Sequence, residues 1–388
     1  MKRVPSWFSP FLALVLTALF LFWLTPKDVG YDGPFQLAKR LLQGQVAFPE
    51  RVSYWEMYER EGEFYLCYAP LASAVLAPLV FLTRGALAQP TLNTLLLLWS
   101  GIGLWCFLRR LRPCRSRATI ATVAYLLATP LFYSATQGSV WFLLHTEGLF
   151  FSMAAMAFLM HRRWFAFGFC FACACGCRNA LLFSLPFTVL ALWPRGYRRL
   201  RWRRFLRRAA LAMLGTLAPL TLWLILQWRM TGSPFVTGYS LAYAEWKQLP
   251  VYQTAFLKNK LSFYFWRFPE LRPGAPWLHF PKGGQSAWII SPFLLLGLAA
   301  PLKSSKTRML IVGLTLVFVP YLFFRWNGSE QYGSRYTTDL FPFLIPLSLL
   351  GAARHKFLGR LWLALVIVAF LITGLALWEL KRGTLGQL

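Results

Sequence analysis

Long apolar runs alternate with short polar segments along almost the whole chain. A helix needs about 17–25 mostly apolar residues to cross a membrane. Eleven runs meet or approach that length, and they lie at residues 8–24, 91–108, 118–134, 148–161, 164–177, 180–194, 209–228, 288–302, 309–324, 340–353 and 361–378. The pattern predicts an all-α polytopic membrane protein with about eleven transmembrane helices, built as a single integral membrane domain over residues 1–388.

Two longer stretches between these runs are richer in polar residues. We expect residues 25–90 to form a first external loop with juxtamembrane helices, and residues 229–286 to form a second large external loop. Within the first loop, the apolar run 69–83 either crosses the membrane or lies as a short helix in the outer leaflet. Within the second, the run 256–269 has the pattern of an amphipathic helix in the outer interface.

Composition supports this interpretation. The chain is 57% hydrophobic and 14% charged, whereas a soluble domain is about 45–50% apolar and about 25% charged. The aromatic content of 18% excludes an intrinsically disordered chain.

Charge decides the orientation. Lys and Arg number 41 against 13 Asp and Glu, and the basic residues fall in short clusters between apolar runs, which is typical of cytoplasmic loops and not of nucleic-acid binding. If 69–83 does not cross the membrane and the N-terminus is cytoplasmic, 23 basic residues lie inside and 18 outside; if it crosses, 15 lie inside and 26 outside. We therefore predict a cytoplasmic N-terminus, an external C-terminus and a run 69–83 that does not cross.

In this orientation the acidic residues are also distributed asymmetrically, although the positive-inside rule concerns only Lys and Arg. All 13 then lie outside or at the outer membrane edge, seven of them in residues 25–68. Chemistry that uses carboxylates is therefore confined to the external face.

Asp32 lies between two glycines a few residues after the first predicted span, and an amphipathic run follows it. An Asp at such a place often caps the N-terminus of a helix. A carboxylate held there beside the membrane is also suited to act as general base for a hydroxyl group. The residues alone leave both interpretations open.

Two further groups of polar residues lie at predicted outer edges. Tyr65 and Tyr68 precede a proline that suits the first turn of a helix. His145 and Glu147 are placed at the outer mouth of the span 148–161. There they either take part in chemistry or only extend their polar ends to the membrane interface. A Glu in the first turn of a helix is also favoured by the helix dipole.

The segment 325–346 concentrates Tyr332, Arg335, Tyr336 and Asp339 at the outer ends of two predicted spans. The planar guanidinium of an arginine presents paired donors that suit phosphate oxygens. The alternative is a structural salt bridge between Arg335 and Asp339.

The order of these motifs resembles the C-type membrane glycosyltransferase superfamily, and within it a bacterial dolichyl-phosphate-mannose protein mannosyltransferase-like group. The resemblance runs nearly from end to end, and the residues that carry it are Asp32, Ala38, Leu41, Leu42 and Gly44, then Gly62, Tyr65, Tyr68, Pro70 and Leu71, then the segments 232–239 and 326–336. Two features depart from the family pattern: no second acidic residue accompanies Asp32, and Asn327, Gly328 and Ser329 replace the commoner double glycine.

The resemblance implies transfer of a sugar from a polyprenyl-phosphate donor to a glycan, lipid or protein acceptor on the outer side of the bacterial inner (plasma) membrane. It assigns Asp32 and Glu147 to catalysis and Arg335 to the donor phosphate. Two further candidates for the phosphate are Arg178 and Lys39, and the candidates for substrate contact are His145, Tyr65, Tyr68, Tyr332 and Tyr336. The lack of an acidic neighbour for Asp32 leaves the need for a divalent metal ion open.

The expected mechanism uses one carboxylate. A phosphate leaves without a general acid, so a single base can take the proton from the acceptor hydroxyl as that oxygen attacks the anomeric carbon from the opposite face, with inversion. The main alternative is a transporter or flippase of lipid-linked saccharides, which would have ionisable residues near the bilayer midplane and two related halves. A third interpretation is a non-catalytic envelope assembly protein of the same fold.

Overall fold

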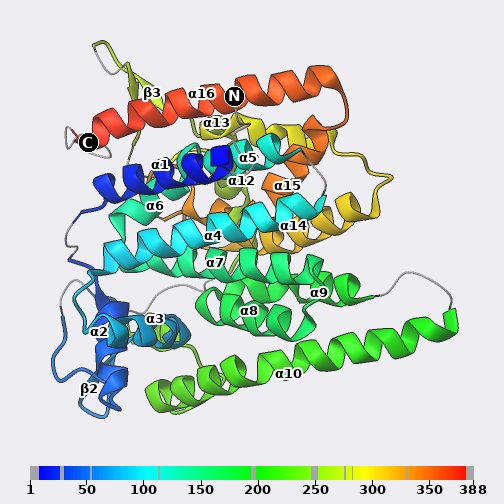
Figure 1. Ribbon diagram of the computed structural model, residues 1–388. Coiled ribbons are helices and arrows are strands. Elements are labelled where there is room, and N and C mark those ends of the chain that lie inside the picture. Colours follow the sequence, from blue (N-terminus) through cyan, green and yellow to red (C-terminus); the bar gives the residue numbers. More distant parts are fainter. Residues whose placement is uncertain are drawn as a thin grey trace.

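The computed structural model describes residues 8–26, 30–52, 55–111, 114–193, 198–245, 252–274, 277–281, 283–328 and 331–381. It is 74% helical and nearly all-α (Figure 1). Five helices are long and apolar enough to cross a membrane: α4 (Gln89–Leu111), α7 (Val140–Met160), α10 (Arg198–Thr231), α14 (Ser305–Phe323) and α16 (Lys356–Lys381). A sixth candidate is the pair α5 (Arg115–Leu127) and α6 (Leu131–Gln137), bent by 52° where Pro130 interrupts the run.

The other predicted crossing runs are also helical, but they are shorter. They are α1 (Phe8–Leu24), α8 (Trp164–Cys177), η1 (Asn179–Ser184) with α9 (Leu185–Leu192), α13 (Ala287–Ile290) with η3 (Pro292–Ala299), and η4 (Arg335–Leu340) with α15 (Phe341–Ala352). The structure therefore supports a membrane protein with five or six long apolar helices, and the count of eleven crossings stays a prediction.

One predicted boundary is wrong in a way that matters for the site. Helix α7 begins at Val140, not at residue 148, because Gly138 ends α6 in the left-handed conformation and Ser139 turns the chain directly into the next helix. His145 and Glu147 consequently lie inside α7 and are completely buried, whereas the sequence placed them at its outer mouth.

The first external segment contains both helices and strands. Helix α2 (Gly33–Leu42) packs against α3 (Pro70–Leu82), and these two lie at one end of the bundle in Figure 1. Helix α3 is the run 69–83, and at this length it is not among the helices long enough to cross.

This segment also contains a β-hairpin that was not predicted from the sequence. Strands β1 (Met57–Arg60) and β2 (Glu63–Leu66) pair antiparallel, with Tyr58 opposite Tyr65. Glu61 and Gly62 connect them with φ values of 55° and 79°. A two-residue turn with both φ values positive matches the twist of the two strands, which is why glycine occupies the second position.

The second external segment is also structured. It holds α11 (Gly238–Glu245), η2 (Thr254–Phe256), α12 (Leu257–Trp266) and the two-residue strands β3 (Glu270–Leu271) and β4 (Leu278–His279). Helix α12 lies within the run 256–269 that was predicted as an amphipathic helix, and it packs against α14.

Helix α7 is the centre of the bundle, with α4 and α8 packed on it, and α10 packs on α8 (Figure 1). The α8–α10 contact needs glycine, since a Cβ added to Gly168 would lie 1.9 Å from the carbonyl oxygen of Ala212, and one added to Gly215 would lie 2.0 Å from that of Phe165. Small residues of this kind let membrane helices approach closely.

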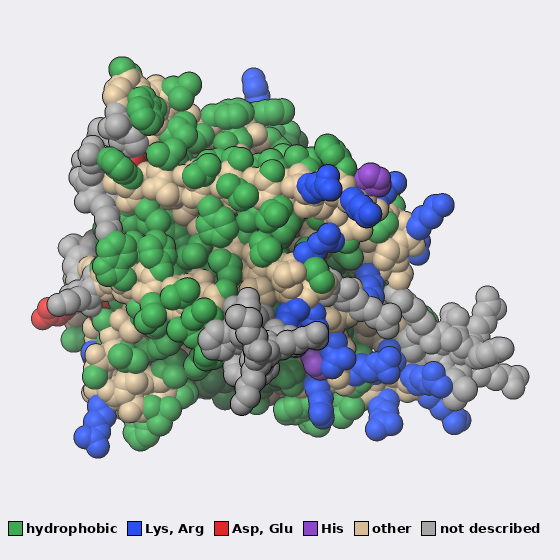
Figure 2. Space-filling view, turned by 45° about the horizontal axis from the view of Figure 1, so that its top comes forward, with side chains coloured by type: hydrophobic (Ala, Val, Ile, Leu, Met, Phe, Trp, Pro, Cys, Tyr) green, Lys and Arg blue, Asp and Glu red, His purple; other side chains and the backbone are tan. Residues whose placement is uncertain are grey.

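Basic residues gather at one end of this bundle. Arg109 and Arg110 end α4, Arg115 begins α5, Arg198 begins α10 and Lys356 begins α16. Figure 2 shows Lys and Arg side chains concentrated at that end, on the right of the view. The opposite end carries α2, α3 and the β1–β2 hairpin (Figure 1), and Asp32 lies there at the N-cap position of α2.

Candidate functional site

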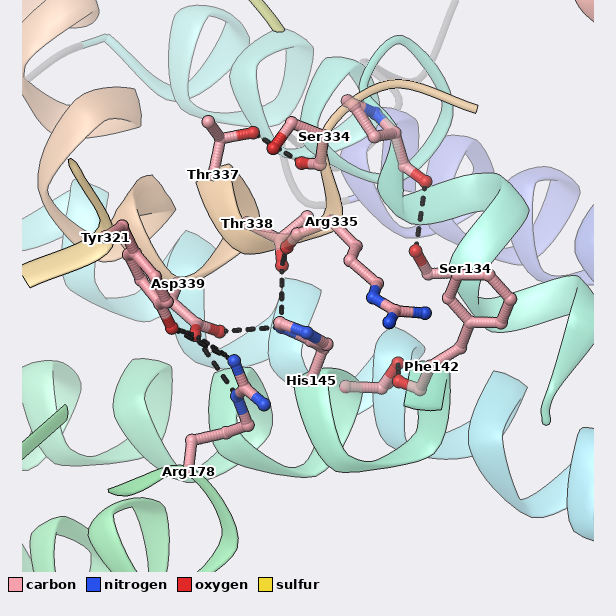
Figure 3. A network of polar contacts seen from close by, with 12 residues as sticks. Ser134, Phe142, His145, Arg178, Tyr321, Ser334, Arg335, Thr337, Thr338 and Asp339 are labelled. Atoms are coloured by element: carbon pink, nitrogen blue, oxygen red, sulfur yellow. Dashed lines mark hydrogen bonds and ion pairs between the residues drawn. The ribbon is translucent and has the colours of Figure 1, made fainter. Parts of the chain in front are cut away.

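A buried carboxylate near the end of η4, that of Asp339, contacts three other elements. Oδ2 of Asp339 accepts hydrogen bonds from Nε and Nη2 of Arg178, at 3.1 and 2.9 Å, and one from the hydroxyl of Tyr321 (Figure 3). Oδ1 of Asp339 lies 3.0 Å from Nδ1 of His145. These contacts fix η4 against the end of α8, against α7 and against α14.

The charge on Asp339 is stabilised despite its burial. Burial alone would raise the pKa of this carboxyl group, but the guanidinium of Arg178, and then the ring of His145, outweigh it and hold the pKa below its usual range. The carboxylate therefore neutralises Arg178 at neutral pH. This contradicts the alternative salt bridge between Arg335 and Asp339, because the partner of Asp339 is Arg178.

Arg335 differs from Arg178 in its surroundings. Its side chain is 8% exposed, and its Nε and Nη1 atoms are buried without a hydrogen-bond partner among the described residues. The guanidinium carbon lies 5.8, 5.7 and 5.5 Å from the ring centroids of Trp141, Phe142 and Tyr336. In Figure 3 this group points away from the Asp339 network and carries no dashed contact. Aromatic rings favour a cation, but they supply no oxygen acceptors for its N–H groups.

Trp141 connects Arg335 to the first external segment. Its ring lies 4.7 Å from the ring of Tyr31, and its Nε1 donates to Oε1 of Glu56 at 3.3 Å. The thiol of Cys67 donates to the other oxygen of Glu56 at 3.6 Å. Burial, followed by the nearby Glu56 carboxylate, raises the pKa of that thiol, so Cys67 stays a neutral donor.

Asp32 directly follows Tyr31 and stands at the N-cap position of α2. Its side chain makes no capping hydrogen bond; instead Oδ2 accepts from Nε2 of Gln36 at 2.5 Å. The side chain is only partly buried. From the first external segment, the ring of Tyr31, which precedes Asp32, and the half-buried carboxylate of Glu56 thus contact Trp141, while the Arg335 guanidinium approaches it from η4.

The loop before Arg335 is held by buried side chains. The Nζ of Lys260, on α12, donates to the carbonyl oxygen of Trp326 and to Oδ1 of Asn327. Gln331 donates to the carbonyl oxygens of Gly283 and Asn327 and accepts from the backbone N–H of Arg335. The second external segment therefore supports the position of Arg335.

The structure does not bring Glu147 to this site. In the part of the chain that the structure describes, neither of its buried carboxylate oxygens has a hydrogen-bond partner, and the side chain interacts electrostatically with Cys173 and Cys177 of α8. His145, two positions earlier on α7, faces Asp339 instead. The two side chains therefore have different surroundings, as expected of residues two apart on a helix, which point in different directions.

The two secondary phosphate candidates are also placed elsewhere. Arg178 is neutralised by Asp339. Lys39 lies over the ring of Phe35 at 4.5 Å and beside Gly85, between α2 and the end of α3.

Of the four predicted substrate tyrosines, one meets Arg335. The ring of Tyr336 contacts the guanidinium groups of Arg335 and Arg178. Tyr332 is buried, contacts Phe132 and Phe280, and bonds Thr373. Tyr65 stacks on Tyr58 and donates to Glu63, and Tyr68 is buried against Tyr239.

Trp141 and Glu56 were not identified from the sequence. Trp141 looked like one aromatic residue among many at a membrane edge, and Glu56 like one of seven acids in the first loop. The available signal was the pair of short apolar and aromatic runs, 57–58 and 64–66, on either side of a polar turn that contains Gly62. That pattern indicates a hairpin and would have placed Glu56 at its base.

Two other features bear on ligands. A cavity of about 410 Å³ is lined by Tyr58, Glu59, Arg60, Thr231 and Leu241, and it includes neither Trp141 nor Arg335. Within the described part of the chain, no three His, Cys, Asp or Glu side chains are grouped so that they could hold a metal ion.

Comparison of the chain with protein-family models, with curated proteins and with solved structures finds no match in any of the three.

Proposed function

We propose that this chain transfers a sugar from a polyprenyl-phosphate donor to an acceptor hydroxyl on the external face of a bacterial inner membrane. The observation that carries the proposal is Arg335, a buried arginine whose Nε and Nη1 have no acceptor among the described residues. Buried donors without acceptors cost free energy, and charged ones cost most. A phosphate would supply the missing oxygen atoms in the geometry that a guanidinium prefers.

Asp32 is the proposed general base. It lies next to Tyr31, whose ring contacts Trp141, and the Arg335 guanidinium lies over the same indole. The carboxylate takes the proton of the acceptor hydroxyl while that oxygen bonds to the anomeric carbon from the face opposite the phosphate. The bond from the anomeric carbon to the phosphate oxygen breaks, its electrons stay on that oxygen, and Arg335 stabilises the resulting charge. Inversion follows.

Glu56 and Tyr336 complete the proposed site. Glu56 holds the Nε1 edge of Trp141, and Tyr336 contacts the Arg335 guanidinium. We assign both to positioning, in place of Glu147, and this removes Glu147 from the catalytic group.

The proposal includes eleven membrane crossings, with the N-terminus cytoplasmic and α3 remaining on the outer side. The concentration of basic side chains at one end of the bundle supports this orientation (Figure 2). The exclusion of α3 from the crossings rests on the basic residues, of which 23 lie inside if α3 does not cross and 15 if it does.

The rival function is transport or flipping of a lipid-linked saccharide, and Glu147 is the observation that favours it. An unpaired carboxyl buried inside an apolar helix is typical of proton or ion pathways in membranes. The contacts of Trp141 with Tyr31, Glu56 and Arg335 argue against it, because they lie at the first turn of α7 and not at mid-helix.

One experiment separates the two functions. The purified chain is placed in lipid nanodiscs with a polyprenyl-phosphate sugar and a panel of hydroxyl acceptors, and the release of free polyprenyl phosphate is measured. Transfer releases it only with a suitable acceptor, and the Arg335→Gln variant releases none. In sealed vesicles a transporter moves the intact donor to the other leaflet without release, and that result would refute the proposal.

A further inference from the structure

Three arginines from two distant segments meet at the basic end of the bundle, far from Arg335. Arg208 on α10 lies over the ring of Trp164, with its guanidinium carbon 4.9 Å from the centroid, and its Nη1 donates to the carbonyl oxygen of Leu192 at 3.2 Å. Arg162, between α7 and α8, and Arg204, one turn before Arg208, both interact electrostatically with it. Three like charges are thus held together by packing.

Within the described chain, nothing neutralises this cluster. Arg162 and Arg204 are exposed and have no hydrogen bond or ion pair to the described residues. The segments that build this end, 161–169 and 198–213, contain no Asp or Glu. The neighbouring Arg163, Arg203 and Arg207 are exposed as well, so the local charge is strongly positive.

The backbone at Arg162 is also unusual. Its φ of 58° is in the left-handed region, at the position after the end of α7 that glycine commonly occupies. An arginine in this conformation is strained. Unlike glycine, however, it provides a long charged side chain at this position.

The cluster adjoins an apolar surface. Below it, on the outward sides of α8 and α10, large apolar side chains are exposed: Phe165 by 51%, Phe169 by 39%, Leu206 by 47%, Met213 by 66% and Leu214 by 54%. The close packing at Gly168 and Gly215 joins the two helices along this surface. A ligand that fits both the arginine cluster and this apolar surface has an anionic head group and hydrocarbon chains.

We propose that Arg162, Arg204 and Arg208 bind the phosphate of an anionic phospholipid, with its acyl chains lying along the exposed faces of α8 and α10. Arg208 is pre-positioned by Trp164 and by the Leu192 carbonyl, while Arg162 and Arg204 reach the phosphate from either side. Membrane proteins recognise acidic lipids through such basic clusters at helix ends. The site is independent of the sugar-transfer proposal.

The test titrates the purified chain, in nonionic detergent, with phosphatidylglycerol and measures bound lipid by native mass spectrometry and the unfolding temperature by tryptophan fluorescence. Phosphatidylcholine with the same chains and free glycerol 3-phosphate are the comparison ligands. We expect phosphatidylglycerol alone to bind and to raise the unfolding temperature. We also expect the double variant Arg162→Gln/Arg204→Gln to bind it about tenfold more weakly or worse.

The matched control is Arg354→Gln/Arg360→Gln, two exposed arginines at the α15–α16 connection, on the opposite side of the bundle from α10 (Figure 1). This control should bind like the wild type. Without lipid, the Arg162→Gln/Arg204→Gln variant should unfold at or above the wild-type temperature, because repulsion is relieved. Equal stabilisation by phosphatidylcholine or by glycerol 3-phosphate, or equal loss in both double variants, would overturn the proposal.

Discussion

Arg178 donates two hydrogen bonds to a single oxygen atom of Asp339, from Nε at 3.1 Å and from Nη2 at 2.9 Å. Asp339 lies four residues after Arg335 on η4, yet Nε and Nη1 of Arg335 have no such acceptor among the described residues. The fold therefore neutralises one buried cation and keeps the other available for a ligand.

The two arginines should consequently respond differently to removal. Arg178→Met leaves the Asp339 carboxylate buried without its main partner, and we expect a loss of about 3–5 kcal/mol in unfolding free energy. Arg335→Met leaves no ion behind and should keep the wild-type stability, while donor binding is lost. Thermal unfolding and donor titration of both variants check this. Equal destabilisation by the two changes would contradict the assignment.

Asp32→Asn tests the general base. The structure weakens the capping interpretation, since the side chain makes no capping hydrogen bond. The amide retains the size of the side chain, so the fold should persist, but it cannot accept the acceptor's proton, and turnover should fall about 10²–10⁴-fold. Steady-state transfer kinetics measure this. Glu63→Gln, in the same loop, is the control and should keep full turnover; a fully active Asp32→Asn would remove Asp32 from catalysis.

Acid should destabilise the protein through Asp339. Because its pKa is lower in the folded chain than in the unfolded one, its ionised form stabilises the fold above the unfolded pKa of about 3.9, and this contribution is lost as the pH falls through and below that value. Unfolding temperatures of the wild type, measured from pH 7 to pH 2, should fall most steeply below about pH 4. The double variant Arg178→Met/Asp339→Leu should show a shallower fall, and parallel curves would be inconsistent with this role.

For Lys260 we predict that its effect on stability becomes more favourable as the pH rises above 7. Burial lowers its pKa to about 7, below the usual value of 10.5. The charged form is therefore disfavoured in the folded chain, and the penalty, complete below pH 7, disappears as the pH rises toward 10.5. The stability of the wild type relative to Lys260→Met should increase across that range. A difference that does not vary with pH would mean that the lysine keeps an ordinary pKa.

Orientation is tested by labelling single cysteines from outside the membrane. Probes at positions 60 and 282 should react and a probe at 201 should not; residue 282 and the side chain at 201 lie outside the described residues. Native Cys114, which is exposed at the basic end, serves as an internal control and should stay unlabelled. Labelling at 201 or at Cys114 would reverse the topology.

The helical runs could be predicted because apolar length is a local property of the sequence. Helices α1 and α8 begin and end at the predicted residues. Partner choice is not local: nothing in the sequence says that Asp339 pairs with Arg178, 161 residues away, and not with Arg335. The predicted start of α7 was wrong for a different reason. His145 and Glu147 look like interface residues in the sequence, and only the structure shows that they are buried.

Gln331 gives the site a mechanical property. One amide group binds Gly283, Asn327 and the backbone of Arg335, and Gln285 binds the neighbouring Gly333. These bonds hold the backbone N–H groups of Gly333 and Arg335, so the backbone here can shift only when both are broken. Such a shift is then a single cooperative event, and the amide protons of Gly333 and Arg335 should exchange with solvent at one common rate.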